Sequence, residues 1–209
     1  TGNDYVALGA GDDVADLNAG DNLVLGDNGV ISVGSGTTTV TTNTASVGGA
    51  DDVTALGGQD VVALGSGDDI ADLGEGDNRV VGDNGAITLT ATTTRVETSD
   101  DALGGSDNVI TGAGHDYVAL GAAGDTANLG AGNNRVLGDS GIISASIGSN
   151  GSVTTGSASN NGVDDIITLA GDDVILGGRG ADIVHAGAGD NIVVGDFGDV
   201  LLDPGLVNV

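Results

Sequence analysis

Residues 177–185 read Gly-Gly-Arg-Gly-Ala-Asp-Ile-Val-His, and variants of this nine-residue pattern recur along most of the 209-residue chain. In each copy an Asp or Asn stands at the sixth position and an apolar residue stands at the eighth. A fixed short period of this kind is typical of stacked solenoids, in which each repeat contacts only its neighbours. The nonapeptide therefore predicts a coil of short strands joined by glycine-rich turns.

The nonapeptides are grouped into a longer repeat of 56 or 57 residues. Gly-Asp-Asn-Gly begins at Gly26 and Gly82, and tetrapeptides with one substitution begin at Gly138 and Gly195. We divide the chain into a truncated unit 1 (residues 1–47), unit 2 (48–98), unit 3 (99–161) and unit 4 (162–209), which we expect to form one continuous solenoid. Because residue 1 falls partway through a unit, we expect the chain to be a segment of a longer protein.

The composition excludes several classes of protein. The chain has 31 acidic residues against four basic ones, a formal net charge of −27, which disfavours nucleic acid as a partner. It has no cysteine for disulfides or thiolate metal sites, and no apolar run of about 18 residues that could span a membrane. Only one Phe and two Tyr are present, whereas 41 glycines are available for turns, so a thin core of Val, Ala, Leu and Ile is expected.

The eighth-position column is apolar in every copy, which predicts a three-residue strand whose middle side chain points inward. The column reads Val6, Ala15, Val24, Val53, Val62, Ala71, Val80, Val109, Val118, Ala127, Val136, Ile166, Ile175, Val184 and Val193. Two nonapeptides make one coil, and strands of successive coils stack about 4.8 Å apart. Disorder does not explain an apolar column that stays in register with the acids.

The sixth-position column provides the candidate metal ligands. Its aspartates are Asp4, Asp13, Asp51, Asp60, Asp69, Asp107, Asp116, Asp125, Asp164, Asp173 and Asp182. Every fourth member of the column is an asparagine, where we expect weaker or altered sites: Asn22, Asn78, Asn134 and Asn191. The tetrapeptide acids follow five residues later as candidate replacement ligands: Asp27, Asp83, Asp139 and Asp196.

Stacking brings these carboxylates to about the 4.8 Å strand spacing, where like charges repel unless a cation lies between them. Calcium fits best, because it accepts six to eight oxygen ligands with loose geometry, whereas Mg²⁺ requires an octahedron and keeps its waters. Zinc would require His or Cys, and only His115 and His185 are available. The sequence therefore predicts several Ca²⁺ ions as cofactors.

The nonapeptides resemble the repeats of RTX (hemolysin-type) proteins, and residues 177–185 match that pattern at every specified position. Most other copies relax the first glycine, and Ala122-Ala123-Gly124-Asp125 has its glycine one place late, which puts that site in doubt. The resemblance implies an all-β fold, a calcium-binding parallel β-roll. It also implies ligation by the sixth-position Asp and turn carbonyls, type I secretion, and a place in a large bacterial surface protein.

The Thr- and Ser-rich intervals 30–47, 86–98 and 142–161 do not follow the nonapeptide. Their residues favour strands, and the breaks at residues 34–36, 148–151 and 203–205 favour hairpin turns. We prefer protruding hairpins that pair between units to the alternative, an additional coil without metal. Stacking of all eleven or so coils would give a rod of about 50 Å, and hairpins outside the roll would shorten it.

These features predict a calcium-dependent structural or spacer segment at the bacterial cell surface, and no enzyme, because no singular cluster of catalytic groups stands out. His115, His185 and the scattered arginines are interpreted as surface residues, with Arg79 and Arg135 relieving charge beside the acids. Calcium, neighbouring segments and other copies of the chain are the expected partners. A self-assembling filament or surface layer is the alternative; an ice-binding or adhesive module is less favoured, because the threonines are clustered and aromatic residues are scarce.

Overall fold

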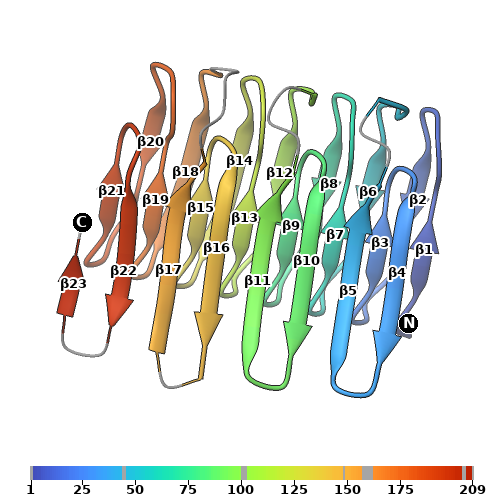
Figure 1. Cartoon of the computed structure of the whole chain (residues 1–209), viewed down its shortest axis with the longest axis horizontal. Helices are drawn as coiled ribbons and strands as arrows, with labels where there is room; N and C mark the ends of the chain where they lie inside the picture. The colour runs from blue at the N-terminus through green and yellow to red at the C-terminus, as the bar shows by residue number, and fades with distance from the viewer. Residues whose placement is uncertain are drawn as a thin grey trace.

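The computed structural model describes residues 2–43, 46–99, 103–147, 149–156, 162–203 and 206–208, and all regular secondary structure in these ranges is β-strand. The strands form three sheets that run along the long axis of the molecule (Figure 1). None of the described residues forms a helix suited to cross a membrane. The chain is therefore an all-β solenoid, as the nonapeptide predicts.

Two parallel sheets make the roll. The central sheet consists of β1 (Tyr5–Ala7), β3 (Leu23–Leu25), β7 (Val61–Ala63), β9 (Arg79–Val81), β13 (Tyr117–Ala119), β15 (Arg135–Leu137), β19 (Val174–Leu176) and β21 (Ile192–Val194). The outer sheet consists of β2 (Val14–Asp16), β6 (Asp52–Thr54), β8 (Ile70–Asp72), β12 (Asn108–Ile110), β14 (Thr126–Ala131), β18 (Asp165–Ala170) and β20 (Ile183–His185). The chain alternates between the two sheets, so that two nonapeptides complete one coil.

The first hydrophobic core lies between these two sheets. The eighth-position side chains pair in register along each sheet, for example Val24 with Val62 and Ala71 with Val109. Except at the two ends of the roll, where Val6 and Val184 are half-buried and Val193 is 45% exposed, they are buried together with turn leucines such as Leu64 and Leu120. The predicted apolar column is thus the core of the roll.

A third sheet is built from hairpins that leave the roll once in every second coil. Its strands are β4 (Gly29–Gly34), β5 (Thr37–Thr42), β10 (Gly85–Thr90), β11 (Thr93–Thr98), β16 (Gly141–Ser146), β17 (Ser149–Thr155), β22 (Asp199–Asp203) and β23 (Leu206–Asn208). Each hairpin pairs antiparallel with the hairpin of the next unit, as β5 does with β10. Figure 1 shows them side by side in front of the roll. In the described residues the predicted hairpins and their pairing between units are confirmed, and the alternative of a metal-free coil is wrong; residues 44, 45, 148, 157–161, 204 and 205 of the predicted intervals and turns lie outside the described ranges.

The hairpin sheet covers the other face of the central sheet and creates a second core. Its inward residues form one continuous row across the strands, in which Val40 pairs with Ile87 and Val96 pairs with Ile143. These side chains pack on residues that flank the eighth position in the central strands, such as Leu25 and Val81. The molecule therefore has three layers, and the eight-stranded central sheet spans about 34 Å at the usual strand spacing.

The irregular turn of unit 3 keeps its place in the roll. Ala123 has a φ of 76°, the one positive value at a non-glycine residue in the described ranges, where other turns place a glycine. Asp125 nevertheless follows in register, and its main-chain N–H donates to Asp164 Oδ1 at 2.9 Å. The displaced glycine is thus accommodated by a left-handed alanine, which is a costly conformation for an L-residue.

Replacing Ile87 by Ala tests the second core. Ile87 is completely buried between the central and hairpin sheets, so we expect Ile87→Ala to lower the free energy of unfolding by about 2 to 5 kcal/mol, measured by urea titration in saturating calcium. Val33 is 53% exposed, and Val33→Ala should change it by less than about 0.5 kcal/mol. Equal effects of the two substitutions would show that the hairpin sheet is not packed on the roll.

Replacing Ala123 by Gly tests the strain in the unit 3 turn. Glycine adopts the left-handed conformation without the strain that Ala123 has, but it also increases the entropy of the unfolded chain. The net effect of Ala123→Gly should be to raise the free energy of unfolding by about 0.5 to 1 kcal/mol. Ala122 is buried and does not have a positive φ, so Ala122→Gly should destabilise the protein in the same assay. Destabilisation by both substitutions would argue against the left-handed turn.

Candidate metal sites

The sixth-position residues line two rows of turns on opposite edges of the roll. The outgoing turns, which lead from the central sheet to the outer sheet, carry aspartate throughout: Asp13, Asp51, Asp69, Asp107, Asp125, Asp164 and Asp182. The returning turns, which lead back to the central sheet, alternate between aspartate and asparagine: Asp4, Asn22, Asp60, Asn78, Asp116, Asn134, Asp173 and Asn191. The sequence column is thus divided by the fold into two chemically different rows.

Each row is a ladder of hydrogen bonds between consecutive coils. One side-chain oxygen of every residue after the first accepts the main-chain N–H of its counterpart in the preceding coil, at 2.7 to 3.1 Å. Asp69 Oδ1, for example, accepts from Asp51 at 2.7 Å, and Asp107 Oδ1 accepts from Asp69 at 3.0 Å. The predicted approach of the acids at the strand spacing is confirmed, and the short Asp side chain is what reaches the next coil.

The second carboxylate oxygen lacks a hydrogen-bond partner in most of these aspartates. Unpartnered, solvent-inaccessible Oδ2 atoms occur in the outgoing row at Asp51, Asp69, Asp107, Asp125, Asp164 and Asp182, and in the returning row at Asp60 and Asp173. A buried carboxylate oxygen without a donor costs free energy that the fold alone does not recover. A cation bound next to these oxygen atoms would offset that cost.

Burial raises the pKa of several carboxyl groups of the outgoing row. In the outgoing row desolvation raises the pKa to about 6 at Asp51, about 7 at Asp69 and about 9 at Asp125, and neighbouring aspartates raise it further. The pKa of Asp107 is raised well above its ordinary value for the same two reasons. Without a cation, the ionised row is therefore unfavourable in the folded chain near neutral pH.

The tetrapeptide aspartates lie beside the outgoing row. Asp27, Asp83 and Asp139 are buried, and each accepts a main-chain N–H from the next coil. Asp83 Oδ1 also accepts the N–H of Gly105, on the chain that returns from the hairpin, at 3.0 Å. Asp83 therefore holds the stem of its hairpin against the roll, and one oxygen remains unpartnered at Asp27 and at Asp139.

This position corrects the expectation that the tetrapeptide acids replace the asparagines. Asn22 precedes strand β3 in a returning turn, whereas Asp27 follows the same strand in an outgoing turn, on the opposite edge of the roll. Asp196 is exposed and lies outside the buried set. That any of these residues, or the sixth-position residues, ligates metal stays a prediction.

The available oxygens suit calcium. No three His, Asp or Glu side chains converge to hold a metal by themselves in the described part of the chain. Calcium takes six to eight oxygens, so backbone carbonyls of the glycine-rich turns would have to complete the ligand set around the free Oδ2 atoms. Bound calcium would supply positive charge beside the Oδ2 atoms that have no hydrogen-bond donor.

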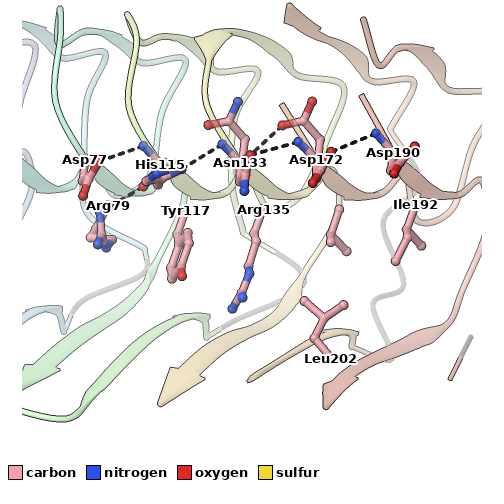
Figure 2. A pocket seen from close by; sticks show the side chains of 13 residues that line it. Asp77, Arg79, His115, Tyr117, Asn133, Arg135, Asp172, Asp190, Ile192 and Leu202 are labelled. Carbon is pink, nitrogen blue, oxygen red and sulfur yellow. Dashed lines mark hydrogen bonds between the residues drawn. The ribbon is translucent and has the colours of Figure 1, made fainter. Parts of the chain in front are cut away.

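A groove of about 600 Å³ lies beside the returning turns and contains the arginines that the sequence placed at the surface. Figure 2 shows Tyr117 between Arg79 and Arg135, whose guanidinium carbons lie 4.7 and 4.9 Å from the ring centroid. Arg79 Nη1 donates to the carbonyls of Asn78 and His115, and desolvation lowers the Arg79 pKa. The interpretation of these two arginines as exposed is wrong, because they stack on Tyr117 against the hairpin sheet.

Sequence reasoning also missed a second ladder, made by fifth-position side chains along this groove. In Figure 2, Asp77 Oδ1 accepts from His115 N, His115 Nδ1 from Asn133 N, and Asn133 Oδ1 from Asp172 N, at 2.8 to 2.9 Å. Polar residues before the sixth position were the available signal. His115 and His185 themselves are exposed, as expected.

The comparisons with known proteins agree with this geometry. The family model of the RTX calcium-binding nonapeptide repeat matches the chain in four copies, at residues 1–30, 54–86, 101–136 and 159–202. None of the curated proteins compared matches the chain, and none of the solved structures does. Because the matched segments cover more than half of the chain and most of the turns that carry the aspartate ladders, the chain belongs to the family of RTX calcium-binding nonapeptide repeat proteins, whose repeats bind several Ca²⁺ ions.

Proposed function

We propose that the chain is a calcium-dependent spacer segment of a secreted bacterial surface protein of adhesin or matrix type. The observation that carries this proposal is the buried outgoing row, in which consecutive aspartates each keep one carboxylate oxygen without a donor. RTX repeats are typical of secreted bacterial proteins, which supports type I secretion and a place outside the cell.

The mechanism is folding coupled to calcium binding. At the low calcium of a cytoplasm, the net charge of −27 keeps the chain extended, because folding would bury ionised carboxylates side by side. At the millimolar calcium outside the cell, ligation offsets that cost and binding free energy becomes folding free energy. The same chain is thus suited to export when unfolded and to rigidity afterwards.

The architecture supports a spacer role rather than catalysis. Every coil repeats the same contacts with its neighbours, so further coils add length along one axis. The hairpin sheet pairs across units and packs on the central sheet, which resists bending between coils. We propose a mechanical role on these grounds, without an enzymatic step.

A calcium titration tests the proposal. Followed by far-ultraviolet circular dichroism at neutral pH, the chain should show little sheet in EDTA and gain a β signal as calcium rises toward millimolar, because the buried carboxylates need a cation. Magnesium at the same concentration should be much less effective. Ordered sheet in thorough EDTA at neutral pH would contradict calcium-dependent folding.

Acid should partly replace calcium. The pKa of Asp51, Asp69, Asp125 and Asp164 is higher in the folded chain, about 6 to 9, than the ordinary value of 3.8, so the folded state binds more protons between about pH 4 and pH 9. The free energy of unfolding of the calcium-free chain must therefore fall as pH rises through this window. We expect the β signal in EDTA to be larger at pH 5 than at pH 8, at constant ionic strength.

Two variants provide the comparison for this pH effect. Asp125→Asn removes the group whose pKa is raised to about 9 and should flatten the alkaline part of the profile. Asp72 is exposed on the outer sheet, and Asp72→Asn should leave the profile unchanged. A calcium-free signal that does not change between pH 5 and pH 8, or one that increases with pH, would refute the effect.

A further inference from the structure

The asparagines of the returning turns are buried as completely as the aspartates, but their side chains are satisfied. Asn22, Asn78 and Asn134 have no exposed surface. Their Oδ1 atoms accept the N–H of the preceding coil at 3.0 to 3.1 Å, as the aspartates do, which fixes the orientation of each amide. The amide nitrogen therefore occupies the position at which an aspartate has its second oxygen.

This nitrogen donates to the carbonyl oxygens of its own turn. Asn22 Nδ2 lies 2.9 Å from the oxygen of Gly20, Asn78 Nδ2 lies 3.0 Å from Gly76, and Asn134 Nδ2 lies 3.2 Å from Gly132. In each case the acceptor is two residues earlier, at the fourth position of the nonapeptide. The turn carbonyl thus receives a donor from within the chain.

The amide also reaches the next coil. Asn22 Nδ2 donates to Asp60 Oδ1 at 2.8 Å; burial raises the pKa of Asp60, and this hydrogen bond opposes the rise. Asn22 therefore joins a turn carbonyl to a carboxylate of the neighbouring coil. A bound cation would make the same connection between the same two kinds of oxygen.

The two edges of the roll consequently differ in charge. The outgoing row has seven sixth-position aspartates and three buried tetrapeptide aspartates, which makes ten carboxylates. The returning row has four aspartates and four asparagines. Of those four, Asp116 already receives the Thr111 hydroxyl at its second oxygen, at 2.8 Å.

We infer that calcium is bound mainly along the outgoing edge, and that asparagine amides take the place of the cation in every second returning turn. This inference rests on the proposed calcium-dependent folding and assigns most of the calcium binding to one edge of the roll. An Asp at an asparagine position would present a second acceptor to the turn carbonyl, and it would create a site. Conversely, an Asn at an outgoing position would remove a calcium site.

Two matched sets of substitutions test the inference, each with one change per unit at the sixth position. Asn22→Asp, Asn78→Asp and Asn134→Asp together should increase the bound calcium by about one ion per restored carboxylate, counted by equilibrium dialysis with metal analysis. Asp51→Asn, Asp107→Asn and Asp164→Asn together should decrease the calcium count. The second set should also give more residual sheet in EDTA than the unaltered chain, because uncharged amides replace buried carboxylates.

The outcomes separate this inference from the function on which it rests. Asp16→Asn with Asp72→Asn changes charge at exposed positions of the outer sheet and should leave the count unchanged. If the unaltered chain binds calcium but the asparagine set adds none, or the outgoing set loses none, the assignment to one edge is overturned. If the unaltered chain binds no calcium, the calcium-dependent function fails first. If the chain with the three Asn→Asp substitutions fails to fold, the calcium count of the chain with the three Asp→Asn substitutions still tests the inference, because uncharged amides favour folding.

Discussion

Each coil of the roll is tied to the next by a main-chain N–H that donates to one oxygen of a sixth-position side chain, and this bond forces the rest of that side chain into the turn. In most of the aspartates the second oxygen is buried without a hydrogen-bond donor, as at Asp69 and Asp107. The bond that sets the register thus also creates the need for a cation, and fold and metal dependence have one origin.

The second constraint is that the central sheet has two buried faces. Eighth-position residues such as Val62 fill the roll, while flanking residues such as Leu25 and Val81 pack on the hairpins. The outer sheet has only one buried face, and its flanking residues, for example Asp72, meet solvent. Ordering the roll on one edge therefore also orders the surface on which the hairpin sheet packs.

The sequence was sufficient for the roll because its two columns repeat without interruption, and the hairpins followed from their composition and central breaks. The packing of the hairpin sheet on the central sheet was not predicted, although the difference between Leu23-Val24-Leu25 and Val14-Ala15-Asp16 contained the signal. The places of Asp27 and Arg79 were also missed. The aligned repeats alone do not show on which edge of a coil a residue lies, because its edge depends on where the hairpins are inserted.

The insertion of the hairpins explains why Asn occurs at every fourth nonapeptide. Each Asn precedes a central strand that leads into a hairpin, and the tetrapeptide Asp follows that same strand, as Asn22 and Asp27 flank β3. A coil with a hairpin therefore keeps two buried-row carboxylates, Asp27 and Asp51, but both lie on the outgoing edge, whereas a plain coil such as that of Asp60 and Asp69 has one on each edge. The charge is conserved per coil and moved to the edge from which the hairpins leave. Because Asp83, the equivalent of Asp27 in the next unit, also accepts the N–H of Gly105 on the chain that returns from the hairpin, the same edge holds that hairpin stem in place.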